Sequence, residues 1–125
     1  MSAVTRLVTF VDVDGRPISG GISASARLDA ELGDGRRVVL LDDRGWGESR
    51  DWNSATAPDL EEAARMVVGP DEPIDGRSHA EESAAHWAYL AGILHRQGVE
   101  VGPAELEKLP HDVEFSSRVI ARVKS

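Results

Sequence analysis

The stretch ISASARLDAEL, residues 22–32, alternates between apolar and polar side chains without interruption. Because successive side chains of a β-strand point to opposite faces, this pattern predicts a strand with one buried face. Gly-Asp-Gly at 33–35 tolerates positive φ angles, and the apolar-rich segment RRVVLLDD follows it. We therefore predict a β-hairpin in which Leu28 faces Leu41 and Ala30 faces Val39.

The earlier segment RLVTFVDVDG, residues 6–15, indicates another strand, which ends in an Asp-Gly turn. Three strands in this order predict an antiparallel meander within residues 4–44. The run from Val38 to Leu41 is apolar at every position. This run favours the third strand as the most buried of the three.

The periodicity becomes helical after residue 54. In TAPDLEEAARMVVGP, residues 56–70, a threonine can cap a helix that Gly-Pro ends. The segment SHAEESAAHWAYLAGILHRQG, residues 78–98, opens with a capping box between Ser78 and Glu81 and carries apolar residues at helical spacing. These two segments predict the main helices, and PAELEKL, residues 103–109, predicts a short helical turn.

The last segment, DVEFSSRVIARVKS at 112–125, fits both the strand and the helix period. We expect a brief extended piece and then a helix from about Ser116. The fold class predicted is α+β over a single compact domain, residues 1–125. In this architecture two main helices and a C-terminal helix pack on one face of a three-stranded antiparallel meander.

The net charge of −8 at pH 7 is concentrated in residues 58–82, which hold eight acidic side chains and two arginines. Such a surface repels nucleic acid and most membranes, so a partner bound by charge is expected to be a protein with a basic surface. The apolar run from Leu7 to Val11 is too short for a signal core or a membrane span, and there is no cysteine. We expect a cytoplasmic protein.

The segment DDRGWGESRDW, residues 42–52, places two tryptophans among acids and arginines. This composition is typical of an interface hot spot, although tryptophans packed over the end of the sheet would account for the same sequence. We predict a partner-binding surface from this segment and the acids that follow it. Its candidate residues are Asp42, Asp43, Arg44, Trp46, Glu48, Trp52, Asp59, Glu61 and Glu62.

Two short patterns point to catalysis. FVDVDGRP, residues 10–17, resembles the first motif of haloacid-dehalogenase-type phosphatases, which implies Asp12 as nucleophile and Asp14 as acid/base around magnesium. An Asp-Gly turn after an amphipathic strand accounts for the same letters, and we interpret the segment in that way. VVLLDD, residues 38–43, has the form of a Walker B strand, but no Gly-x-x-x-x-Gly-Lys-[Ser/Thr] loop accompanies it, which excludes nucleotide hydrolysis.

His79, Glu82 and His86 share a helix face at spacings that could present them to a metal ion. A solvated Glu82 and His86 pair is the simpler interpretation, so we assign no metal ligand, no cofactor and no catalytic residue.

A compact acidic body of this kind favours protein binding. We expect a small module that neutralises a basic partner, as immunity proteins and antitoxins do. An accessory subunit of a larger complex, or a small metal-dependent or small-molecule enzyme, are the alternatives.

Overall fold

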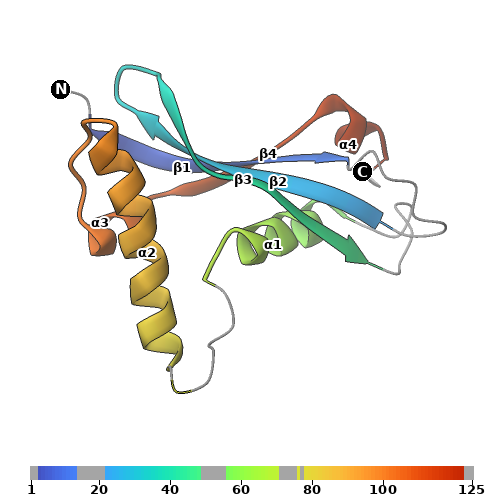
Figure 1. Ribbon diagram of the computed structural model, residues 1–125. Helices are drawn as coiled ribbons and strands as arrows, with labels where there is room; N and C mark the ends of the chain where they lie inside the picture. The colour runs from blue at the N-terminus through green and yellow to red at the C-terminus, as the bar shows by residue number, and fades with distance from the viewer. Residues whose placement is uncertain (1–2, 14–21, 49–55, 71–75, 77, 123–125) are drawn as a thin grey trace.

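The computed structural model describes residues 3–13, 22–48, 56–70, 76 and 78–122. These residues form an α+β fold in which four strands make one sheet and four helices accompany it (Figure 1). The strands are β1 (Val4–Val13), β2 (Ile22–Leu32), β3 (Arg37–Glu48) and β4 (His111–Phe115). The helices are α1 (Ala57–Val67), α2 (His79–Arg96), α3 (Pro103–Glu107) and α4 (Ser117–Arg122).

The sheet has the order β3-β2-β1-β4. Its first three strands pair antiparallel, as the predicted meander requires. The brief extended piece expected near the C-terminus is β4, which adds to β1 in parallel and makes the sheet mixed. A parallel neighbour needs a long crossover connection, and the helical part of the chain between β3 and β4 supplies it.

The predicted hairpin joins β2 to β3 through a loop of Gly33, Asp34 and Gly35. The Leu32 amide donates to the Arg36 carbonyl at 2.8 Å, and the Gly35 amide donates to the Leu32 carbonyl at 2.9 Å. Gly35 has a φ angle of 90°, a value that side-chain-bearing residues rarely adopt. The hairpin therefore depends on the glycine that the sequence places there.

The pairing of β2 with β3 is irregular on both sides of Leu28, and the second irregularity changes the predicted register. Leu28 faces Leu41 as expected, but Ala30 faces Val38 instead of Val39, because Leu40 is an extra residue in β3. Leu40 and Leu41 are consequently both buried on the core side of the sheet. The bulge explains the unbroken apolar run.

The expectation that β3 is the most buried strand is wrong. It is an edge strand, whereas β1 and β2 lie inside the sheet. Val39 is 48% exposed on the sheet face opposite the core. The apolar run reflects two consecutive leucines on one side, not burial of both faces.

Both predicted helix starts are confirmed. Thr56 caps α1 and Ser78 caps α2, each with a capping box completed by Asp59 and Glu81 respectively. α2 ends before Gly98, which has a φ angle of 82°. These ends follow from local sequence because capping partners are only a few residues apart.

Two clusters of buried residues form the core. The larger one fills the space between the sheet and α2 and α3, with Leu28, Leu90 and Leu106 among its members. The second lies around α1 and includes Leu60 and Val119. Figure 1 shows α1, α2 and α3 on the same side of the sheet, as expected for the main helices.

The C-terminal helix differs from the prediction in its position. α4 lies at the end of the sheet, where it contacts β1 and β4, and not alongside α1 and α2 (Figure 1). Only Ser116 separates it from β4, so the helix stays at the carboxyl end of that strand. Its buried Val119 joins the second cluster.

The face of the sheet opposite the main core carries an ion-pair network across all four strands. Arg6 on β1 donates to Glu31 on β2 and to Asp112 on β4, at 2.6 and 2.8 Å. Arg37 on β3 donates to Glu31 and to Glu114. Hydrogen bonds from Arg6 and then from Arg37 hold the pKa of Glu31 below its ordinary value. The network therefore helps to hold the parallel strand in register.

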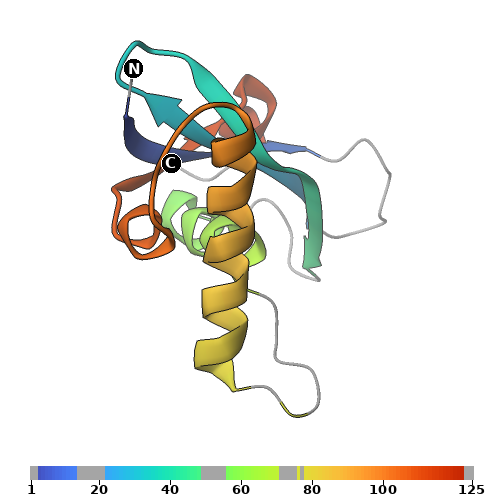
Figure 2. The ribbon, with the colours of Figure 1, turned by 60° about the vertical axis from the view of Figure 1, so that its left-hand side comes forward.

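Helix α2 is only partly covered by the rest of the fold. Its buried residues Leu90, Ala91 and Leu94 all lie in its C-terminal half, while the N-terminal half projects beyond the sheet (Figure 2). Tyr89, at the border between the halves, is 60% exposed. In the part of the chain that the structure describes, no helix is long and apolar enough to cross a membrane.

Candidate functional site

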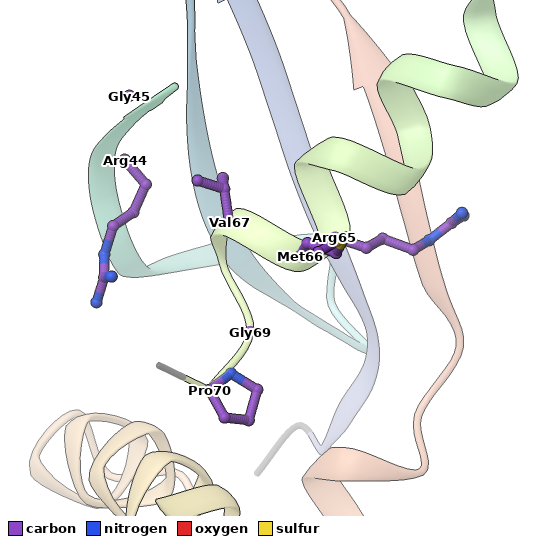
Figure 3. A pocket seen from close by; sticks show the side chains of 7 residues that line it. All are labelled: Arg44, Gly45, Arg65, Met66, Val67, Gly69 and Pro70. Atoms are coloured by element: carbon purple, nitrogen blue, oxygen red, sulfur yellow. The ribbon is translucent and has the colours of Figure 1, made fainter. Parts of the chain in front are cut away.

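An open groove of about 520 Å³ lies between β3 and the C-terminal end of α1 (Figure 3). It forms because the chain reverses direction after β3, so that the end of α1 returns to the middle of that strand. The lining residues are Arg44, Gly45, Arg65, Met66, Val67, Gly69 and Pro70. The predicted binding segment therefore does border a concave surface, together with a part of α1 that was not predicted.

The groove side of α1 follows from the helix period. Leu60 and Ala64 are buried against the sheet, and Val67 is half-buried at the groove. Met66 lies outside this inner stripe and is 73% exposed. Met66 was not among the predicted site residues, although a large apolar residue outside the buried stripe of an amphipathic helix is a recognisable signal.

The two arginines of the groove point in different directions (Figure 3). Arg44, half-buried on β3, lies on one side of the groove and points away from Arg65 (Figure 3). Arg65 extends to the other side, where its Nη2 donates to the backbone carbonyl of His111 on β4 at 3.1 Å. Arg44 therefore contributes charge at the groove, and Arg65 connects α1 to β4.

Trp46 belongs to the packing of the core. Its half-buried side chain contacts both core clusters, so it links them at the end of β3. Its indole Nε1 is buried and has no hydrogen-bond partner among the described residues. Trp52, the second tryptophan of the predicted site, lies outside the described residues.

The predicted acids occupy several environments. Asp42 on β3 and Glu62 on α1 are exposed, and Glu61 is half-buried. Asp59 accepts a hydrogen bond from the Thr56 amide in the capping box, so it stabilises the start of α1. Asp43 and Glu48 are both β3 residues whose side chains lie outside the described part of the structure.

His111, which was not among the predicted site residues, lies next to this site. The Nε2 of His111 is 2.5 Å from the Oγ1 of Thr9, and Thr9 is fully buried. Burial of the His111 ring, and then the positive charge of Arg65, hold the pKa of His111 below its ordinary value, while the charge of Asp112 acts in the opposite direction. The neutral imidazole is therefore favoured at neutral pH.

Asp12, the residue that the phosphatase resemblance implies as nucleophile, connects β1 to the segment around α4. Asp12, at the end of β1, accepts hydrogen bonds from the Ser116 hydroxyl at 2.8 Å and from Arg118 Nη2 at 2.6 Å. Burial opposes its ionisation, but these hydrogen bonds and one from the Val13 amide lower the pKa of Asp12. Asp14 lies outside the described residues.

The two histidines considered as metal ligands, His79 and His86, lie on α2. His79 and His86 are two helical turns apart, which separates them by roughly 10 Å along the axis. The His86 ring packs edge-on against Trp87, with centroids 5.1 Å apart. No group of three potential metal-ligating side chains occurs among the described residues.

Comparisons with protein-family models, with curated proteins and with solved structures found no match for this chain. Its functional interpretation therefore comes from its own residues and from the surface between β3 and α1.

Proposed function

We propose that this chain is a small protein-binding module that engages a partner with a basic surface. The binding site is the β3–α1 surface, which we define as the groove together with the exposed acid Glu62, one helical turn before Met66 on α1. The observation that carries the proposal is the groove itself, because exposed Met66 and half-buried Val67 provide apolar contact area there. Arg65 at the groove is bonded to the His111 carbonyl, and the exposed carboxylate of Glu62 is available to a basic group of the partner.

The composition of this surface matches what protein interfaces use. Their centres are apolar with methionine, arginine and aromatic residues enriched, and their rims are polar. Met66 has a flexible, polarisable side chain that adapts to irregular partners. Glu62 lies one helical turn before it on the same face of α1, so a basic group of the partner can pair there while an apolar group contacts Met66.

Charge supports a basic partner. The chain carries −8 at pH 7, which accelerates encounter with a positively charged protein and repels nucleic acid. A neutraliser of a basic toxin, of the immunity or antitoxin kind, uses this combination of a small acidic body and a local apolar contact. A permanent subunit of a complex would use the same surface with a larger buried area.

The proposal is tested by co-expressing the chain with the product of its neighbouring gene and measuring the dissociation constant by calorimetry. Glu62→Lys reverses the charge beside Met66 and is expected to weaken binding about tenfold or more, since a like charge faces the basic partner. Met66→Ala removes the apolar contact and is expected to weaken it by roughly the same factor.

Glu107→Lys is the matched control. It makes the same change of charge at an exposed position on α3, away from the β3–α1 surface, and is expected to alter the dissociation constant by less than about threefold. The proposal is wrong if Glu62→Lys and Glu107→Lys weaken binding equally, or if added salt strengthens the complex.

A further inference from the structure

His111 lies where three parts of the fold meet. It is the first residue of β4 and pairs with Leu7 on β1. Its ring is beside the buried hydroxyl of Thr9, also on β1. Its backbone carbonyl accepts the hydrogen bond from Arg65 on α1. A change at this histidine therefore acts on the edge of the sheet and on α1 at once.

The charged groups that act on the ring come from two elements. Arg65 on α1 disfavours a positive imidazolium, whereas Asp112, the next residue on β4, favours it. From β1 the ring faces Thr9, which is uncharged and has no access to solvent. When the His111 ring gains a proton, its imidazolium and the Arg65 guanidinium place two positive charges at the contact between α1 and β4. The ring is partly removed from water there.

This contact is continuous with the β3–α1 surface. Arg65 is followed by Met66 and Val67, and all three line the groove. The amide of Gly69 donates to the Met66 carbonyl at 3.2 Å, which closes the last turn of α1. Displacing Arg65 from β4 therefore changes the wall of the groove.

We propose that His111 is a pH-sensitive switch that controls the C-terminal end of α1, and through it partner binding at the β3–α1 surface. With a neutral ring, Arg65 stays on the carbonyl of β4 and the groove keeps its shape. With a protonated ring, repulsion between imidazolium and guanidinium releases Arg65, and the last turn of α1 loosens. The binding part of this inference rests on the proposed function, while the structural part does not.

The structural part is tested by NMR on the free protein between pH 8 and pH 5. The imidazole resonance of His111 is expected to titrate below pH 6.5, and the amide resonance of Gly69 is expected to shift with the same midpoint. His111→Gln should abolish the Gly69 transition, because glutamine keeps a polar side chain but does not gain a proton. His95→Gln removes an exposed histidine at the end of α2 and should leave the transition intact.

A second variant keeps the test sharp if His111→Gln folds poorly. Arg65→Gln changes an exposed side chain and removes the repulsion, so the titration of His111 should move to higher pH and the Gly69 shift should diminish. The switch is overturned if His111 titrates at or above pH 6.5, if Gly69 does not follow it, or if His95→Gln removes the Gly69 transition.

The binding part needs the partner from the co-expression experiment. Its affinity for the wild-type chain is expected to fall by roughly threefold from pH 7.5 to pH 5.5. A change of this size corresponds to the loss of one solvent-accessible charge contact. His111→Gln should remove that fall. A partner that binds with the same affinity at both pH values would leave the proposed function standing and overturn the binding part of the switch. Conversely, absence of any partner overturns the function but leaves the NMR result valid.

Discussion

Gly35 determines the geometry of the hairpin between β2 and β3, because its φ angle of 90° lies in a region that alanine occupies at a cost. Gly35→Ala is expected to reduce the free energy of unfolding by about 1 to 2 kcal/mol, measured by urea denaturation. Gly35→Asn should recover part of the loss, since asparagine tolerates positive φ better than other side chains do.

Gly33 provides the comparison within the same loop. A Cβ atom there would lie 3.8 Å from the Ala3 carbonyl and from Thr5 Cγ2, which is ordinary contact, and its φ angle is not in the left-handed region. Gly33→Ala should therefore be neutral or slightly stabilising. Equal losses for the two variants would mean that loop packing, not backbone conformation, selects glycine in this turn.

Residues whose roles depend on nearby sequence were predictable, and those that depend on distant contacts were not. The caps Thr56 and Ser78 were identified because their partners lie three residues away. For Trp46 the sequence left two roles open, a binding surface or packing over the end of the sheet, because the choice depends on how β3 meets α1. Met66 was not predicted as a site residue, although its place outside the buried stripe of α1 can be recognised in the sequence. In the fold, Trp46 packs against the core although its segment is charged, and Met66 is exposed although it lies in an amphipathic helix.

At the scale of elements, the contacts that stabilise α2 are unevenly distributed along the helix. Leu94, in its C-terminal half, is fully buried in the larger cluster, whereas Tyr89 is largely exposed. Leu94→Ala is expected to cost about 2 to 5 kcal/mol through lost burial and the remaining cavity. Thermal and urea unfolding followed by circular dichroism would measure it.

Tyr89→Ala is the control on the same helix, and it should change stability by less than about 1 kcal/mol. A loss comparable with that of Leu94→Ala would show that the exposed side of α2 at Tyr89 is packed against something in solution. A partner chain or a second copy could provide that contact.

The elements themselves were largely predictable, but their pairing was less so. Alternation in residues 22–32 identified β2, and the change to helical period located α1 and α2. The parallel addition of β4 was not foreseen, since its five residues pair with β1 across more than a hundred positions of sequence. The bulge at Leu40 was also missed, because an extra residue in a strand leaves an apolar run that resembles full burial.

At the scale of the whole molecule, charge links the fold to the proposed site. The ion-pair network that holds β4 lies on the face of the sheet opposite the main core, whereas Glu62 of the β3–α1 surface lies on α1. Acidification affects both, because it protonates carboxylates that pair with arginine and removes negative charge that attracts a basic partner. Stability and binding are therefore expected to respond to pH through different residues.

Stability should fall as the solution is made acidic. His111, Glu31 and Asp12 all have pKa values below their ordinary ones in the folded protein. Below the ordinary pKa of each group the unfolded chain takes up a proton that the folded chain resists, so folding loses stability as the pH decreases. His111 contributes first, below pH 6.5, and the carboxylates contribute below about pH 4.5.

Urea denaturation at pH 7.5, 6.0, 5.0 and 4.0 would separate these contributions. His111→Gln should remove the loss between pH 6.5 and 5 and leave the later one, because glutamine does not titrate. Protonation of exposed carboxylates acts in the opposite direction, since it relieves the repulsion of a chain that carries −8 at neutral pH. Repeating the series in about 0.5 M salt screens that repulsion between exposed groups while leaving the burial of His111 unchanged. If the wild-type chain grows steadily more stable from pH 7.5 to pH 5.0 even at this salt concentration, the burial of a neutral His111 in solution is contradicted.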